Sequence, residues 1–183
     1  MRPYDHVPFQ WSVHRQEWAG ELIKRYDFLA KNTSDPRVQF LETLCDAVKG
    51  ADSIVVYNQR FEASRLDDLA RWLPRHRQEI AEIKAKLWDL LAVVRCSVYH
   101  PAFGGSFSLK RVAAAILPDM SYDDLGVADG IQAGIAWAQL VDPATSPEEK
   151  DKLKRALLQY CGQDTIALAR IIEELVKQSR ATG

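Results

Sequence analysis

The sequence contains few cysteines, and they are widely spaced. Its three thiols, Cys45, Cys96 and Cys161, form no Cys-x-x-Cys pair. Isolated thiols argue against a disulfide framework and against a zinc knuckle, and they suit a reducing compartment. We therefore expect a cytoplasmic location.

Long apolar runs are also lacking. No stretch of the sequence approaches the roughly 18 consecutive apolar residues that a membrane-spanning helix needs. The N-terminal residues MRPYDHVPFQWSVH lack the apolar core of a signal peptide. These two absences predict a protein that has no membrane partner.

Neither sign of charge is in excess. The 183 residues include 24 Lys and Arg against 25 Asp and Glu, which gives a formal net charge of −1. This balance provides no general attraction to nucleic acid, so a nucleic-acid site has to be a local patch of charge. The length favours a single domain, residues 1–183, which is large enough to bury a core of its own.

The pattern of apolar residues predicts an α/β fold with a small sheet. Alternating or β-branched segments predict a strand that begins near Val7 and two more at residues 26–30 and 53–57. Helical spacing and end signals predict helices at residues 34–50, 61–73, 76–90, 108–117, 129–140 and 146–177. Residues 90–101 fit a strand or a helix, and Gly162 could bend the last helix.

An asparagine and a glutamate follow the buried strand at residues 53–57. Asn58 stands at its carboxyl end, and Glu62 stands in the first turn of the next predicted helix. Ligands in open α/β sheets bind beyond the carboxyl ends of strands, so Glu62 could be a metal ligand there. Spacing alone favours the alternative, in which Glu62 stabilises the helix dipole and Asn58 belongs to a turn.

An aspartate interrupts the apolar stripe of the last predicted helix. Tyr160 and Asp164 are one helical turn apart, between Leu157 and Leu168 on the same face. Aspartate is almost never fully buried unless it is paired or bound to metal, which indicates a functional role. An equally weighted alternative is that Asp164 caps a second helix after a break at Gly162.

Together these segments resemble the motifs of the DEDD superfamily of 3′–5′ exonucleases. YNQRFE resembles the second motif, and YCGQD matches the third motif of the DEDDy branch, Tyr-x-x-x-Asp. Between them, WDLLAVVR and GSFSLKRVAAAIL resemble the Asp-centred segment and the Ser-Leu-Lys helix of that superfamily. The wider pattern in PFQWSVH, VYHPAFGGSFSLK and DGIQAG is most similar to a bacterial family, DUF2779.

The resemblance implies a DnaQ-like, ribonuclease H-like fold in which helices flank a small mixed sheet. It also implies two Mg²⁺ or Mn²⁺ ions, which can stabilise the attacking and leaving oxygens of a phosphodiester. Carried over to this chain, Glu62 and Asp164 become metal ligands, and Tyr160 orients or deprotonates the attacking water. The substrate-binding residues that the resemblance implies are Asn58, Arg65, Lys110 and Arg111.

The first motif of the superfamily, Asp-x-Glu, has no counterpart in this sequence. It should precede PFQWSVH, but no Asp-x-Glu occurs before Glu17, and Asp5 is a poor substitute. We therefore expect an N-terminally truncated domain that lacks the first strand and two of the four metal-binding carboxylates of the superfamily. The missing strand should leave a gap, with unpaired backbone, between the strand near Val7 and the strand at residues 53–57.

Two interpretations of function remain open. In the first, the chain is a metal-dependent 3′–5′ exonuclease domain for single-stranded DNA or RNA, and this truncated form has little or no activity. In the second, a non-catalytic domain of the same fold binds nucleic acid or a protein, which the arginines within residues 60–77 favour. A third and weaker interpretation is a helical interaction module unrelated to nucleases. The oligomeric state does not follow from the sequence.

Overall fold

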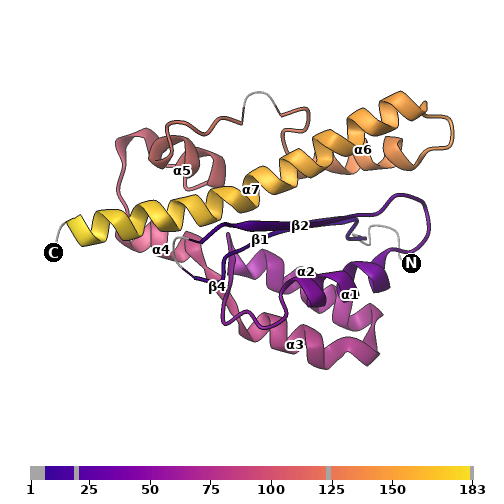
Figure 1. Ribbon diagram of the computed structural model, residues 1–183, viewed down its shortest axis with the longest axis horizontal. Helices are drawn as coiled ribbons and strands as arrows, with labels where there is room; N and C mark the ends of the chain where they lie inside the picture. The colour runs from indigo at the N-terminus through magenta and orange to yellow at the C-terminus, as the bar shows by residue number, and fades with distance from the viewer. Residues whose placement is uncertain (1–6, 19–20, 123–124, 182–183) are drawn as a thin grey trace.

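The computed structural model describes residues 7–18, 21–122 and 125–181 (Figure 1). Its elements, in chain order, are β1 (Gln10–Arg15), β2 (Lys24–Leu29), α1 (Arg37–Ala47), β3 (Ile54–Val56), α2 (Gln59–Trp72), η1 (Pro74–His76), α3 (Arg77–Ala85), β4 (Leu87–Asp89), α4 (Leu90–Ser97), η2 (Pro101–Phe103), α5 (Leu109–Ile116), α6 (Gly130–Val141) and α7 (Pro147–Ala181). Within these described ranges, no helix is both long and apolar enough to cross a membrane.

Two small sheets replace the single mixed sheet that the sequence predicts. β1 and β2 pair in antiparallel orientation, with Trp11 opposite Phe28. β3 and β4 pair in parallel orientation, with Val55 opposite Trp88. In Figure 1, α7 runs along one side of the β1–β2 sheet, and α1, α2 and α3 lie on the other side. The fold is therefore mixed α/β, with two-stranded sheets flanked by helices.

Each sheet keeps an edge that has no strand partner. Among the described residues, β1 pairs only with β2, and β3 pairs only with β4. The sequence predicts a gap between β1 and β3, and in the described residues these two strands belong to different sheets. Unpaired strand edges present free N–H and C=O groups that can accept a further strand.

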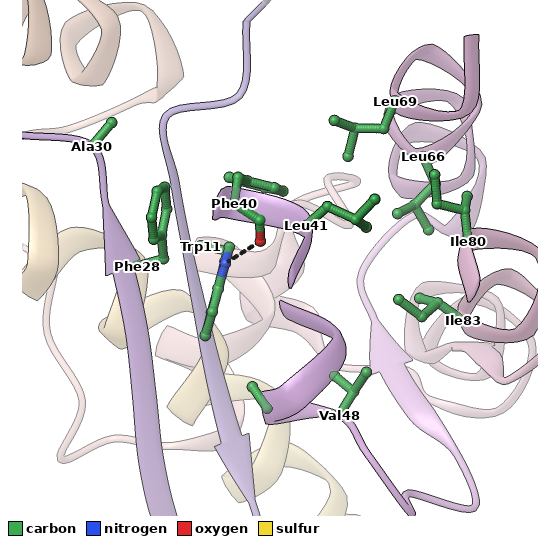
Figure 2. Packing of buried hydrophobic residues seen from close by; sticks show 11 residues of the cluster. Trp11, Phe28, Ala30, Phe40, Leu41, Val48, Leu66, Leu69, Ile80 and Ile83 are labelled. Atoms are coloured by element: carbon green, nitrogen blue, oxygen red, sulfur yellow. Dashed lines mark hydrogen bonds between the residues drawn. The ribbon is translucent and has the colours of Figure 1, made fainter. Parts of the chain in front are cut away.

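Trp11 joins the β1–β2 hairpin to α1 in the largest apolar core. Its indole Nε1 donates a hydrogen bond of 3.1 Å to the carbonyl oxygen of Phe40 (Figure 2). Phe28 lies beside both residues, with its ring stacked on that of Trp11 and edge-on to that of Phe40. Other buried members of this core come from α1 and its C-terminal end, α2 and α3: Leu41, Ala47, Val48, Leu66, Leu69, Ile80 and Ile83.

The polar face of β1 packs against α7 and does not face solvent. Gln10 Nε2 donates a hydrogen bond of 3.4 Å to the carbonyl oxygen of Leu157. His14 Nδ1 lies 2.8 Å from the hydroxyl of Thr165. Burial, helped by the charge of Arg25, lowers the pKa of His14, so the imidazole is neutral at pH 7.

Gly162 provides room for an arginine within the last helix. α7 is continuous through this position, so Gly162 does not interrupt the helix. A Cβ at position 162 would lie 2.2 Å from Cζ of Arg25. The Arg25 guanidinium donates a hydrogen bond to the carbonyl oxygen of Leu158 and is paired with Asp27. Position 162 therefore requires a glycine, because the Arg25 side chain from β2 packs against the α7 backbone there.

The substitution Gly162→Ala is expected to stabilise the protein only when Arg25 is also removed. In an Arg25→Ala background, alanine contributes its helix-propensity advantage of about 1 kcal/mol. In the wild type, displacement of the guanidinium loses a hydrogen bond worth about 1 kcal/mol, which offsets that gain. Urea denaturation of the four proteins of this double-mutant cycle measures the coupling. Equal effects of Gly162→Ala in the two backgrounds would contradict the expectation.

The segment after α3 corrects one predicted helix and resolves an ambiguous one. The predicted helix at residues 76–90 ends at Ala85, and Leu87–Asp89 form β4 instead. Asp89 then caps α4, because its Oδ1 accepts a hydrogen bond of 3.0 Å from the backbone N–H of Leu91. Most of the undecided segment at residues 90–101 is consequently helical.

Candidate functional site

A group of polar side chains lies where α5 meets α7. It consists of Lys110 from α5, Tyr122 from the following loop, and Tyr160 and Asp164 from α7, and it is termed the Lys110 cluster. Lys110 Nζ lies 5.3 Å from the ring centroid of Tyr122 and 5.5 Å from that of Tyr160. Burial raises the pKa of Asp164, and the charge of Lys110 acts against this shift. Three predicted site residues, Lys110, Tyr160 and Asp164, are thus brought together.

The local sequence explains how these side chains are positioned. Ser108 caps α5, with its Oγ 3.4 Å from the backbone N–H of Arg111, which places Lys110 in the first turn. Asp164 lies one turn after Tyr160 and one turn before the buried Leu168. The packing of α7 on its apolar core therefore turns the tyrosine and the aspartate towards α5.

The carboxylate of Asp164 is desolvated and short of hydrogen bonds. Burial raises the pKa of Asp164, against the opposing effects of the Lys110 ammonium and the Tyr122 hydroxyl. Tyr122 is close enough to shift this pKa, yet neither Asp164 Oδ1 nor Tyr122 Oη makes a hydrogen bond of normal geometry with any described residue. A buried carboxylate oxygen without a partner is costly, and a bound cation is one way to satisfy it.

The alternative role for Asp164, as the cap of a second helix, is wrong. α7 runs without interruption from Pro147 to Ala181, so Asp164 stands in the helix interior. Aspartate is a poor choice there, because its side chain competes for backbone hydrogen bonds and favours helix caps. Neither helix propensity nor capping therefore accounts for this aspartate.

Tyr160 is a neutral phenol under ordinary conditions. Burial, followed by the charge of Asp164, raises the pKa of Tyr160 to about 12. At pH 7 its hydroxyl therefore keeps its proton and can orient a water molecule through hydrogen bonds. Of the two roles that the family resemblance implies, orientation of water fits this chemistry and deprotonation of water does not.

The second group of predicted residues lies at the start of α2, and Asn58 leads it. Asn58 has φ 75° and ψ 72°, and among the described residues it alone has a positive φ without being a glycine. Its backbone N–H donates a hydrogen bond of 3.0 Å to Asp89 Oδ1, the oxygen that also caps α4 through Leu91. Asp89 therefore ties the end of β3 to the start of α4. The amide of Asn58 makes no capping bond to α2 and lies in an exposed residue.

Glu62 and Arg65 follow on the first turns of α2. Burial raises the pKa of Glu62, and the charge of Arg65 acts in the opposite direction. Glu62 stands in the first turn of α2, where a glutamate can stabilise the helix dipole. A glutamate with only that role would be solvated, whereas the carboxylate of Glu62 is desolvated. Arg65 forms an ion pair of 3.0 Å with Asp68, and its guanidinium lies 5.7 Å from the ring centroid of Phe61.

The two groups border one apolar core but remain electrostatically separate. Tyr57, next to Asn58 in the sequence, and Tyr122 both pack on the same buried cluster. The pKa shifts of Glu62 and Asp164, however, contain no contribution from each other. The described part of the chain holds no cluster of three or more His, Cys, Asp and Glu side chains suited to a metal ion. Arg111, the remaining predicted contact, is exposed on α5.

The substitutions Asn58→Ala and Asn58→Gly are expected to separate the backbone role of Asn58 from its side-chain role. Alanine tolerates the left-handed conformation less well, so Asn58→Ala should lower the free energy of unfolding by about 1 kcal/mol. Glycine adopts this conformation without steric cost, so Asn58→Gly should not share that loss. Urea denaturation measures the difference. A glycine variant that is as unstable as the alanine variant would show that φ does not limit this position.

Sequence reasoning missed Tyr122 and the bridging role of Asp89. Tyr122 stands in the polar segment DMSYDDLG, where its spacing gives no relation to Tyr160 or Asp164. Asp89 did carry a signal, since an aspartate directly before the apolar run LLAVV is typical of a helix cap. That signal was concealed because the same residues also continue the amphipathic pattern of the preceding helix.

Comparison with known proteins identifies a family for the first part of the chain. A family model described as "Domain of unknown function (DUF2779)" matches residues 1–108, which is more than half of the sequence. The matched range includes Asn58, Glu62 and Arg65, and it ends before Lys110. No curated protein and no solved structure gives a significant match.

Proposed function

The chain belongs to the DUF2779 family, and we propose that it is a domain of the metal-dependent 3′–5′ exonuclease type that acts on single-stranded DNA or RNA. The observation that carries this proposal is the carboxylate of Asp164 in the Tyr-x-x-x-Asp segment. It is desolvated, its Oδ1 has no hydrogen-bond partner in the described residues, and Tyr160 and Lys110 lie beside it. The α/β architecture and the unpaired edges of β1 and β3 are compatible with a ribonuclease H-like arrangement.

The available side chains fit a cation-assisted hydrolysis in part. In this proposal, Asp164 and Glu62 hold Mg²⁺ or Mn²⁺, which prefer carboxylate oxygens. A cation held there would supply positive charge to the phosphodiester oxygens. Tyr160 orients that water as a neutral phenol. The contacts to the nucleic acid come from Asn58, Arg65, Lys110 and Arg111.

A second candidate function is the binding of nucleic acid without cleavage. It is favoured because the described residues lack a group of three or more potential metal ligands. Two carboxylates compensate the charge of two divalent ions poorly, so hydrolysis by this chain should be slow even where strands bind. Binding of this kind weakens steeply with salt, because each phosphate contact releases counterions.

The test incubates the 183-residue chain with a 5′-labelled single strand in Mg²⁺, in Mn²⁺ or in EDTA. An exonuclease shortens the strand stepwise from its 3′ end, only in the presence of the divalent ion, and a strand with a blocked 3′ end resists. Glu62→Gln keeps the size of the side chain and removes its charge, so it should slow this shortening. Fluorescence anisotropy at low and high salt, in EDTA, measures binding separately.

The outcomes separate the two candidates. Metal-dependent shortening that Glu62→Gln slows supports the exonuclease. Salt-dependent binding without shortening supports the second candidate. A chain that neither shortens nor binds single strands at low salt overturns both.

A further inference from the structure

A hollow of about 610 Å³ opens beyond the carboxyl ends of the parallel strands β3 and β4. Its walls come from the end of β3, the first turn of α2, the middle of α4 and the loop that leads into α5. The lining residues that matter here are Tyr57, Asn58, Phe61, Arg95, Gly105 and Phe107. Ligands in α/β proteins bind in this position relative to the strands.

One wall of the hollow is held rigidly. The Tyr57 hydroxyl donates a hydrogen bond of 2.7 Å to the carbonyl oxygen of Phe107, which fixes the loop to the end of β3. The Phe107 ring packs edge-on against Phe103, whose side chain is buried in the core. Gly105, in the same loop, has φ 80°, and a Cβ there would meet no atom within 4 Å, so the loop leaves this side open.

The opposite wall carries an aromatic ring that the core does not use. Phe61 is 57% exposed, although it stands in the first turn of α2 beside the buried side of that helix. The Arg65 guanidinium lies 5.7 Å from the centroid of the Phe61 ring. An exposed phenylalanine at the mouth of a hollow is a ready surface on which a flat ring can stack.

A second arginine supplies charge on the far side. The Arg95 guanidinium lies 5.9 Å from the ring centroid of Phe107, and within the described ranges it forms no ion pair. Asp89 accepts hydrogen bonds from two backbone N–H groups at the start of α2 and of α4. Phe61, Phe107 and the Arg95 guanidinium all line the hollow. This combination suits a flat base joined to a phosphate, because bases stack on aromatic faces and phosphates pair with arginine.

We propose that this hollow binds one nucleotide of a single-stranded nucleic acid, with the base stacked on Phe61 and a neighbouring phosphate on Arg95. The proposal deepens the function above and rests on it for the nature of the strand. It adds two residues, Phe61 and Arg95, that set the position of the strand relative to Asn58. Stacking of this kind tolerates any base, so the site selects for a base without selecting for sequence.

The experiment compares a short fluorescein-labelled single strand with the same strand from which the bases are missing, both in EDTA to prevent cleavage. The proteins are the wild type, Phe61→Ala, Phe61→Tyr and Arg95→Gln. Trp18→Ala serves as the matched control, because Trp18 is another exposed aromatic, at 74%, and lies outside the hollow. Binding of 5′-AMP to each protein is measured in parallel by calorimetry.

We expect Phe61→Ala to weaken binding of the base-bearing strand by about 5- to 150-fold, the range for loss of one stacked base. It should leave the abasic strand unaffected, and Phe61→Tyr should restore binding because it restores the ring. Arg95→Gln should weaken both strands and reduce the salt dependence of binding. Trp18→Ala should bind as the wild type does.

The result that overturns the proposal is unchanged affinity of Phe61→Ala for the base-bearing strand and for 5′-AMP, or no binding of either ligand to the wild type. The proposed function can fail on its own. If 5′-AMP binds and Phe61→Ala abolishes that binding, the nucleotide site stands even where strands are neither cut nor bound. Conversely, if Phe61→Ala still shortens strands and binds the base-bearing strand and 5′-AMP as the wild type does, the exonuclease stands and the stacking site is removed.

Discussion

The substitution Asp164→Asn is expected to lower Mn²⁺-dependent shortening of single strands by at least about 100-fold, because a neutral amide cannot replace a carboxylate that holds the cation. Asparagine keeps the size and shape of the side chain, so the packing of α7 on its core should be preserved. The measurement is the initial rate of shortening of a 5′-labelled strand at several Mn²⁺ concentrations. In the proposed site, loss of a ligand weakens binding of the ion, so excess Mn²⁺ should recover only part of the rate.

The same substitution is expected to stabilise the cation-free protein at neutral pH. Burial raises the pKa of Asp164 in the folded chain above its value in the unfolded chain. As the pH rises through the window between these two pKa values, the unfolded chain has already released its proton, and the free energy of unfolding of the wild type falls. Asp164→Asn has no such loss, so its advantage is largest above the window. Urea unfolding in EDTA, from about pH 4 to about pH 8, measures this difference.

A matched variant separates the site from a general effect of charge on the helix. Asp151 is an exposed aspartate near the start of the same helix, so Asp151→Asn should change neither the rate nor the pH dependence described above. Mn²⁺ should raise the melting temperature of the wild type and of Asp151→Asn but not that of Asp164→Asn. Asp164→Asn that cuts strands normally, or that is less stable than the wild type at pH 7, would remove Asp164 from the site.

The substitution Leu157→Ala is expected to lower the free energy of unfolding by about 2 to 5 kcal/mol. Leu157 is fully buried on α7, where it joins Leu29 from β2 and Leu140 from α6 in one apolar cluster. Removal of its side chain leaves a cavity between β2, α6 and α7. These packed elements can shift only a little to fill that cavity. Differential scanning calorimetry should show a fall in melting temperature of about 5 to 20 °C.

Lys154→Ala provides the control for this expectation. Lys154 lies one turn before Leu157 on an exposed face of α7, and alanine is the better helix former. This variant should unfold within about 0.5 kcal/mol of the wild type. A small effect of Leu157→Ala, similar to that of Lys154→Ala, would show that α7 does not carry the packing of β2 and α6.

Much of the chain's local structure could be predicted because its signals are local. Asp129 accepts hydrogen bonds from two backbone N–H groups at the start of α6, and Ser146 accepts one at the start of α7. The helices that begin at both positions were predicted from short stretches of sequence, as was the strand that ends before Asn58. Helix caps and β-branched runs depend on neighbouring residues, so one sequence is enough to recognise them.

Features that depend on distant residues could not be predicted. The alternation near Val7 predicted a strand, but no local pattern shows that α7, which follows more than a hundred residues later, covers Gln10 and His14 of β1. β4 was assigned to a helix because its three residues continue an amphipathic pattern, and only their pairing with β3 makes them a strand. The division into two sheets also reflects which strands meet, which no local pattern encodes.

The candidate site shows the same limit. Tyr160 and Asp164 could be paired from their helical spacing, and Lys110 followed from the family resemblance. Tyr122 and Arg95 could not be assigned to a site from the sequence. Their positions depend on the path of a loop and on the packing of helices, which no local pattern encodes. The depth of burial that shifts the pKa of Asp164 likewise belongs to the assembled core.

The contact between β1 and α7 cannot form until nearly the whole chain has been synthesised. His14 and Thr165 are 151 positions apart. At about 5 to 20 residues per second, β1 leaves the ribosome roughly 10 to 30 s before its partner on α7. During that interval the hairpin lacks its cover and exposes strand edges to other nascent chains and to chaperones. The finished chain must then close a very long loop, so the last and slowest event of folding should be the docking of its final helix on its first strand.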